Sequence, residues 1–158
     1  MVMGMEFPNI EDVLENIRFN QTLSPTNMTD CAYLDQNHLD VICQAPNWID
    51  GVEIHQYPQI TRLLSIQNTS LALLSPKDFE NKTIHGLDIS NNLQLTALHH
   101  QVFHGMNETL QVLRIHRTNL WNKDSPLGFF GLFHGLVHLK HLLIEDNGNL
   151  NLEAKTYR

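Results

Sequence analysis

The chain has little of three things: cysteine, basic residues and long apolar runs. Its 158 residues include 2 cysteines, and 10 lysines and arginines stand against 17 aspartates and glutamates, which gives a formal net charge of −7. The few cations are scattered, so nucleic acid and anionic membranes are poor candidates for partners. No apolar stretch approaches the ~20 residues that span a bilayer. We therefore expect no membrane span in this chain.

The two cysteines exclude the common zinc motifs. Cys31 and Cys43 belong to no C-x-x-C pair and to no Cys/His cluster with zinc spacing. Their separation suits two strands of a short hairpin joined by a disulfide bond. Two buried free thiols are the alternative.

Catalytic motifs are also missing. The sequence contains no H-E-x-x-H, no G-x-S-x-G and no phosphate-binding glycine-rich loop, and its serines, histidines and aspartates have no spacing typical of a catalytic triad. The 10 histidines could form a metal site or a pH-sensitive surface. We predict no metal site, no cofactor and no enzymatic activity.

The N-terminal segment lacks the features of a secretion signal, because acidic residues interrupt it before an apolar region can form. Asparagines in the N-x-[ST] acceptor pattern nevertheless favour secretion. They are Asn20, Asn27, Asn68, Asn81 and Asn107. We expect a secreted or extracellular protein whose gene model is incomplete at the start.

The strongest positive signal is an internal repeat. Residues 84–92, "IHGLDISNN", fit the pattern L-x-x-L-x-L-x-x-N-x-L, and three further copies begin at Thr61, Leu110 and Leu139. The third apolar anchors of the four copies are Ile66, Ile89, Ile115 and Ile144, and they are spaced by 23, 26 and 29 residues. Downstream of the first three copies, an apolar-x-x-apolar step precedes Phe79, Phe103 and Phe133.

These motifs resemble the leucine-rich-repeat superfamily over about residues 60 to 150. The resemblance implies an α/β fold, a curved solenoid of about four repeats with one short parallel strand per repeat on its concave face. Residues 31–48 are similar to the later part of the cysteine-rich N-terminal cap of extracellular members. We accordingly divide the chain into a poorly determined segment (1–19), a cap (20–59) and truncated repeats (60–158).

Within each repeat, alternation predicts which side chains are buried. In the second and third copies, leucine and isoleucine point to one side of the strand, whereas Asp88 and Arg114 point to the other. Asn92 and Asn147 close their copies and can bond neighbouring backbone, because an amide both donates and accepts. Thr69 and Thr118 take the same position in the other two copies and can do part of this work.

The alternate side chains are expected to face solvent on the concave face and to bind a ligand there. They are Arg62, Gln67, His85, Asp88, Ser90, Arg114, His116, Arg117, Lys140, His141 and Glu145. Simply solvated strand faces are the alternative.

The resemblance implies a non-catalytic extracellular module that recognises a protein or glycan through its concave face. The combined motifs are similar to secreted arthropod members of the superfamily, which include the non-catalytic subunit of a shrimp luciferase. A fragment of a receptor ectodomain, of the Toll-like or hormone-receptor kind, is an alternative reading. An intracellular repeat scaffold is another.

Overall fold

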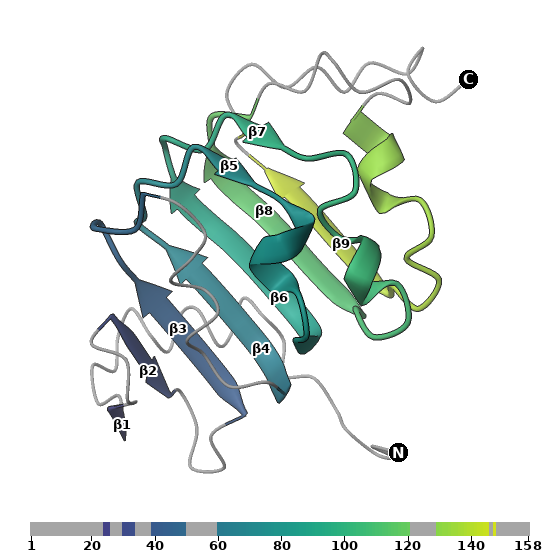
Figure 1. The fold of residues 1–158 in the computed structure, drawn as a ribbon, viewed down its shortest axis with the longest axis horizontal. Coiled ribbons are helices and arrows are strands. Elements are labelled where there is room, and N and C mark those ends of the chain that lie inside the picture. The colour runs from purple at the N-terminus through teal and green to yellow at the C-terminus, as the bar shows by residue number, and fades with distance from the viewer. Residues whose placement is uncertain are drawn as a thin grey trace.

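The structure, a computed structural model, describes residues 24–25, 30–33, 39–49, 60–120, 129–145 and 147. The described strands form one large sheet with the order β1-β2-β3-β4-β6-β8-β9, and a second sheet pairs β5 with β7. Figure 1 shows the strands of the large sheet side by side in the order of the chain. The strands of this sheet thus keep their order along the chain, although β5 and β7 of the second sheet lie between some of them in sequence.

Five strands of the large sheet are parallel. They are β3 (Asp40–Gln44), β4 (Ile60–Gln67), β6 (Thr83–Asn92), β8 (Val112–Thr118) and β9 (His141–Glu145). Ile66 pairs with Ile89, Ile89 with Ile115, and Ile115 with Ile144. The isoleucines that the sequence pattern made equivalent thus lie in a single row across the sheet.

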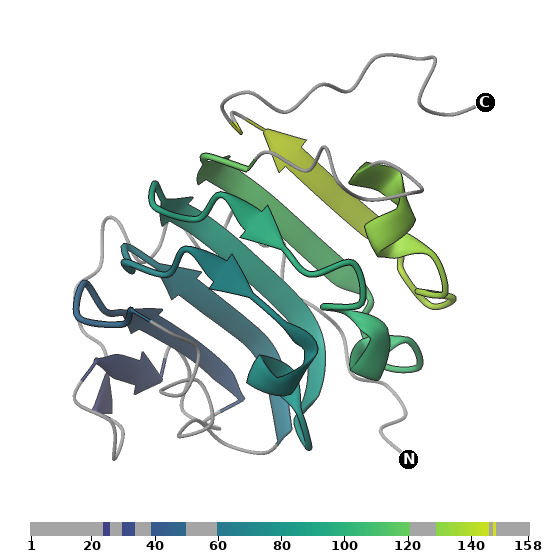
Figure 2. The ribbon, with the colours of Figure 1, turned by 45° about the horizontal axis from the view of Figure 1, so that its top comes forward.

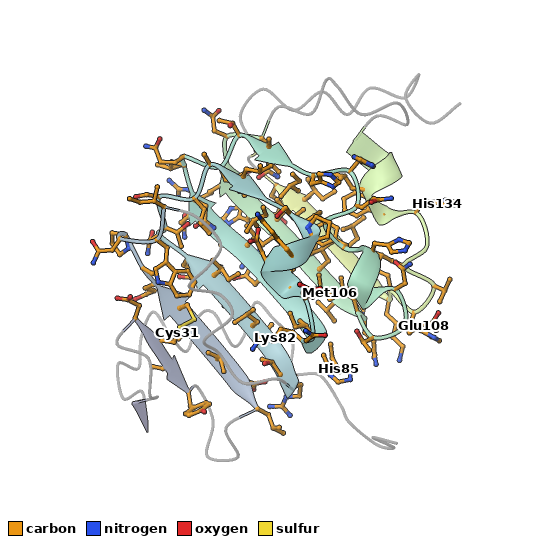
Figure 3. The ribbon with its side chains drawn as sticks, in the orientation of Figure 1. Cys31, Lys82, His85, Met106, Glu108 and His134 are labelled. Carbon is orange, nitrogen blue, oxygen red and sulfur yellow. A yellow bond between two sulfur atoms is a disulfide. The ribbon has the colours of Figure 1, made fainter. Side chains whose placement is uncertain are left out.

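The N-terminal edge of the sheet is antiparallel. β1 (Ser24–Pro25) pairs with β2 (Cys31–Tyr33), and β2 pairs with β3 so that Cys31 lies opposite Cys43. The two cysteines form a disulfide bond, seen beside Cys31 in Figure 3. The prediction of a bridged hairpin is confirmed, and the alternative of free thiols is wrong.

β3 belongs to both parts of the sheet. It is antiparallel to β2, but it is parallel to β4 and places Cys43 in the row of Ile66. The parallel stack therefore starts one strand before the first copy of the sequence pattern.

A second layer covers one face of the large sheet. It contains β5 (Leu73–Leu74), β7 (Ala97–Leu98) and three 3-10 helices, η2 (Pro76–Phe79), η3 (His104–Met106) and η4 (Phe129–Phe133). Figures 1 and 2 both show these elements on the same side of the sheet. Each of these elements lies in a connection between two parallel strands of the large sheet. We call one parallel strand together with the connection that follows it a turn.

The core lies between these two layers. Aliphatic side chains of β4, β6 and β8 meet leucines of the second layer, among them Leu74 and Leu98. Phe79 and Phe103 are buried in the core, and the rings of Phe103 and Phe133 stack with centroids 6.2 Å apart. Burying an apolar side chain of this size contributes roughly 1.5–3 kcal/mol, so the repeated phenylalanines help to hold successive turns together.

Buried asparagines link successive turns where the strands end. The Asn92 amide donates to the backbone oxygen of Ile66 at 2.9 Å, and the Asn147 amide donates to that of Ile115 at 3.0 Å. The predicted bonds to neighbouring backbone are confirmed. The threonine prediction is confirmed for Thr69, whose hydroxyl oxygen accepts from the backbone N–H of Leu71 at 3.3 Å. In addition, the hydroxyls of Thr69 and Thr118 each donate, at 2.7 Å, to the side-chain oxygen of the asparagine one turn later.

Candidate binding surface on the second face of the sheet

The candidate site lies on the face of the large sheet that points away from the core, which we call the second face. Alternation along the parallel strands sends Val41, Leu64, Leu87 and Leu113 into the core, so the residues next to them in each strand belong to the second face. The pairing arranges these residues in three rows. The first row is Asp40, Leu63, Gly86, Val112 and His141; the second is Ile42, Ser65, Asp88, Arg114 and Leu143; the third is Gln44, Gln67, Ser90, His116 and Glu145.

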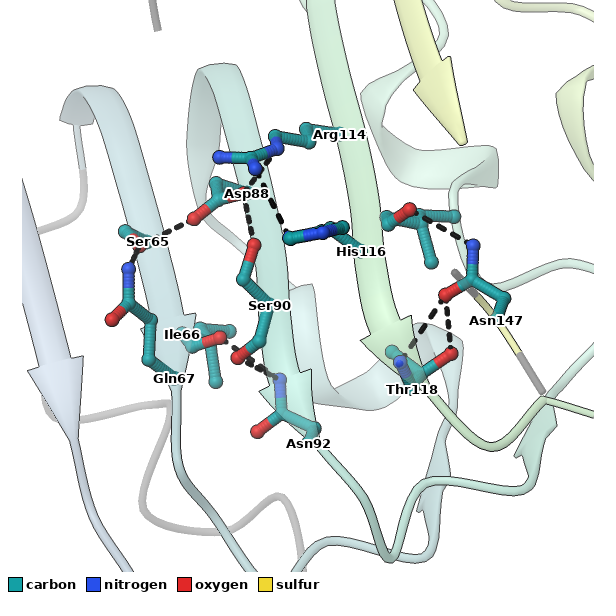
Figure 4. Close-up of polar contacts among 11 residues, drawn as sticks. Ser65, Ile66, Gln67, Asp88, Ser90, Asn92, Arg114, His116, Thr118 and Asn147 are labelled. Atoms are coloured by element: carbon teal, nitrogen blue, oxygen red, sulfur yellow. Dashed lines mark hydrogen bonds and ion pairs between the residues drawn. The ribbon is translucent and has the colours of Figure 1, made fainter. Parts of the chain in front are cut away.

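Asp88 is at the centre of this face and is fully buried. The Ser65 hydroxyl donates to one carboxylate oxygen of Asp88 at 2.7 Å, and the Ser90 hydroxyl donates to the other at 2.6 Å (Figure 4). Both oxygens therefore have a short hydrogen bond, which compensates part of the cost of burying the group.

Glutamines extend the network towards β3. The Gln67 amide donates to the Ser65 hydroxyl oxygen at 3.0 Å, and the Gln44 amide donates to the Gln67 side-chain oxygen at 3.3 Å. At the beginning of the strands, the Arg62 guanidinium donates to Asp40 through two nitrogens. Hydrogen bonds and an ion pair thus connect side chains from three neighbouring strands, β3, β4 and β6.

Arg114 and His116 continue the network on β8. A terminal nitrogen of the Arg114 guanidinium lies 3.0 Å from His116 Nδ1, and Arg114 Nε lies 4.0 Å from the Asp88 carboxylate. The second distance is too long for a hydrogen bond. Arg114 Nε is buried and has no hydrogen-bond partner among the residues that the structure describes.

The electrostatics of Asp88 follow from its burial. Burial raises the pKa of the Asp88 carboxyl above its ordinary value, although hydrogen bonds from Ser90 and Ser65 and the charge of Arg114 act in the opposite direction. Burial thus favours the neutral carboxyl, whereas the serine hydroxyls and Arg114 favour the carboxylate.

Seven of the eleven predicted binding residues lie in the rows of the second face. They are Gln67, Asp88, Ser90, Arg114, His116, His141 and Glu145. Arg62, His85 and Lys140 lie near the beginnings of strands, and Arg117 lies near the end of β8 with a φ of 54°. Figure 3 shows His85 near the beginning of β6.

The expectation that these side chains face solvent is wrong for part of the set. Gln67, Asp88 and Ser90 are buried, whereas Arg117, Lys140, His141 and Glu145 are exposed. The predicted binding residues that are exposed therefore lie on β8 and β9 or directly before β9. Sequence reasoning also missed Asp40 and Gln44, and the alternation in "LDVICQ" is the signal that could have placed them on the same face.

The predicted glycosylation sites have different surroundings. Asn68 and Asn81 are exposed, at φ values of 53° and 61°. Asn107 is half-buried, and its side-chain oxygen is buried without a hydrogen-bond partner among the described residues. Asn20 and Asn27 lie outside the described residues.

A cavity of about 650 Å³ opens on the second layer between η2 and η3. Phe79, Asn81, Lys82, Val102 and His104 are among the residues that line it. A glycan on Asn81 would extend from this cavity, so we do not regard it as the main binding site.

Within the described part of the chain, no helix has the length and apolar character needed to cross a membrane. No three His, Cys, Asp or Glu side chains of the described residues come together as a metal site would require. Comparisons with protein-family models, with curated proteins and with solved structures gave no match.

Proposed function

We propose that this chain is a non-catalytic extracellular binding module, a leucine-rich-repeat solenoid that recognises a protein ligand through its second face. The proposal is carried by the polar rows that the parallel register assembles across β3, β4, β6, β8 and β9, in which Gln44, His141 and Glu145 are exposed and Gln67, Asp88 and Ser90 are buried. Their mutual hydrogen bonds hold them in place before a ligand arrives, so little conformational entropy is lost on binding.

Several features support the solenoid reading. The isoleucine row, the asparagine at the end of a turn and the repeated phenylalanine all recur with the period of the sequence motif. A stack in which each turn contacts mainly its neighbours is the architecture that such repeats form. The Cys31–Cys43 disulfide bond is compatible with an extracellular location.

A glycan placed on each face in turn would test the proposal. The substitution His116→Asn turns residues 116–118 into an N-x-T acceptor on the second face. The substitution Leu73→Asn turns residues 73–75 into an N-x-S acceptor on the second layer, where Leu73 is half exposed, and serves as the matched control.

Ligands would first be selected with the unmodified protein from a displayed library of secreted proteins. We expect the glycan at position 116 to abolish their binding and the glycan at position 73 to leave it unchanged. Ligands that tolerate the first glycan but not the second would place recognition on the other face and refute the proposal.

A further inference from the structure

The cavity of about 650 Å³ on the second layer has a glycosylation acceptor, Asn81, in its own wall. The 3-10 helices η2 and η3 contact each other, and residues of both line the cavity. Phe79 and Val102 are 4% and 1% exposed and form apolar parts of the wall, whereas Gln101 and His104 are exposed and polar. The volume lies within the range of roughly 300–1,000 Å³ that small ligands occupy.

A tight turn holds Asn81 at this cavity. The backbone N–H of Lys82 donates to the carbonyl oxygen of Phe79 at 3.3 Å. Between them, Glu80 has a φ of −63° and a ψ of 137°, and Asn81 has a φ of 61°. These angles match a type II β-turn, whose third residue needs a positive φ and is often asparagine. The turn therefore places the acceptor amide and the Phe79 ring, two residues apart in sequence, on the border of one cavity.

From this geometry we infer that the cavity binds the first sugar of a glycan attached to Asn81 and that this sugar stabilises the fold. The inference shares an extracellular location with the proposed function but does not involve the ligand of the second face. During secretion the Asn81 side-chain nitrogen displaces the diphosphate of a lipid-linked oligosaccharide. The bond from nitrogen to C1 of the sugar forms, the bond from C1 to the phosphate oxygen breaks, one amide proton is released and the lipid diphosphate leaves. Thr83 completes the N-x-[ST] acceptor.

The wall of the cavity suits an N-acetylglucosamine ring. The C–H groups on the faces of this sugar can contact the Phe79 ring, whose faces are electrostatically negative, and the methyl groups of Val102. The exposed side chains of Gln101 and His104 can bond its hydroxyl and N-acetyl groups. Because a covalent bond already holds the sugar beside the cavity, its effective concentration there is high and little entropy is lost when it enters.

Asn68 provides a comparison within the same chain. Like Asn81 it is exposed and has a positive φ, 53° against 61°. Among the described residues, however, Asn68 does not line this cavity. A glycan on Asn68 therefore reports the general effect of a bulky hydrophilic group on stability, without contacts in the cavity.

The test compares the Tm of the full chain secreted by a eukaryotic host with that of the same chain from the bacterial periplasm, which forms disulfide bonds but adds no such glycan. Thr83→Ala removes the acceptor at Asn81, and Ser70→Ala removes the acceptor at Asn68. For each sequence we subtract the Tm of the unglycosylated form from that of the glycosylated form. The subtraction cancels the effect of the substitution itself, including the lost hydrogen bond from the Ser70 hydroxyl to the Pro46 backbone oxygen.

We expect glycosylation to raise the Tm of the unmodified chain by about 2–4 °C. Trimming each glycan to its first sugar with an endoglycosidase should keep this increase. Thr83→Ala should lose the increase, and Ser70→Ala should retain it. The inference is overturned by an increase that survives Thr83→Ala, by an increase that disappears on trimming, or by secreted protein without a glycan on Asn81.

A larger side chain in the cavity should displace the sugar and leave the acceptor intact. Gly105 lines the cavity, and an added Cβ there has nothing within 4 Å. We expect Gly105→Leu to remove most of the Tm increase, although Asn81 remains glycosylated and the unglycosylated form keeps its Tm.

A direct measurement serves if the Thr83→Ala variant does not fold. In protein with isotope-labelled sugars, nuclear Overhauser effects should connect the first sugar on Asn81 to the Val102 methyl groups and should be absent in Gly105→Leu. Their absence in the unmodified protein would refute the inference. The experiment with the glycan at position 116 is independent of these measurements, so the proposed function succeeds or fails separately.

Discussion

Asp88 is the side chain on which the polar network of the second face converges. Two serine hydroxyls and the charge of Arg114 favour its ionised form, but burial opposes them and raises the pKa of the carboxyl. The folded protein therefore binds this proton more tightly than the unfolded chain does. The contribution of Asp88 to stability is smallest above the folded pKa and increases as the pH falls through it.

The substitution Asp88→Asn removes this titration and keeps the shape of the side chain. We expect the free energy of unfolding of the unmodified protein to rise relative to that of the variant as the pH falls from neutral towards 3.8, the ordinary pKa of an aspartate. Urea unfolding at several pH values measures the difference. Glu80→Gln, which removes one negative charge at an exposed position, is the control. A difference that is constant with pH, or that changes in the opposite sense, would contradict the prediction.

At the scale of elements, Gly135 marks a place where two connecting segments come close together. Gly135, just after η4, has a φ of 91°, and an added Cβ would lie 3.2 Å from the Asn107 amide nitrogen. Gly105, in η3, has nothing within 4 Å of the same position. Two glycines from equivalent connections thus differ in conformation and in surroundings.

We expect Gly135→Ala to lower the free energy of unfolding by roughly 1–3 kcal/mol, because its backbone conformation disfavours a side chain and the Asn107 amide must move. Gly105→Ala should leave stability unchanged or raise it by up to ~1 kcal/mol. Chemical denaturation of both variants provides the comparison. Equal effects of the two substitutions would show that the contact with Asn107 is unimportant.

The sequence pattern predicted the main strands because their apolar residues recur at fixed positions. It identified the row from Ile66 to Ile144 and the bridged hairpin. It did not identify β5 and β7, because two-residue strands such as Leu73–Leu74 leave no alternation and form only when turns stack. Nor did it predict the burial of Asp88, whose partner Ser65 is 23 residues away in sequence.

At the scale of the whole molecule, the two faces of the sheet have different chemistry. One is covered by the second layer and its aliphatic and aromatic core, and the other carries the polar rows. Asn81 lies in the connection between η2 and β6, and Asn68 lies directly after β4. Glycans at these positions would extend from connecting segments rather than from the three rows.

We expect folded, secreted protein to carry glycans at Asn68 and Asn81 but not at Asn107. The Asn107 amide packs against Gly135, so a glycan there would separate the two connections. Mass spectrometry of glycopeptides after expression in a eukaryotic secretory host measures occupancy at each site. Thr109→Ala, which destroys the third acceptor, should leave the total glycan mass unchanged. High occupancy at Asn107 in folded material would contradict this prediction.

The order of the strands also has a consequence for how the protein forms and opens. Every strand of the large sheet pairs with the strand of that sheet that precedes or follows it along the chain, so structure can spread from one turn to the next without closing long loops. The Cys31–Cys43 disulfide bond fixes one end of this series. At the other end, Leu142 is 37% exposed and Ile144 is only half-buried. We therefore expect the sheet to open locally from β9, so that amide hydrogens exchange with solvent earliest on β9 and latest near β4 and β6.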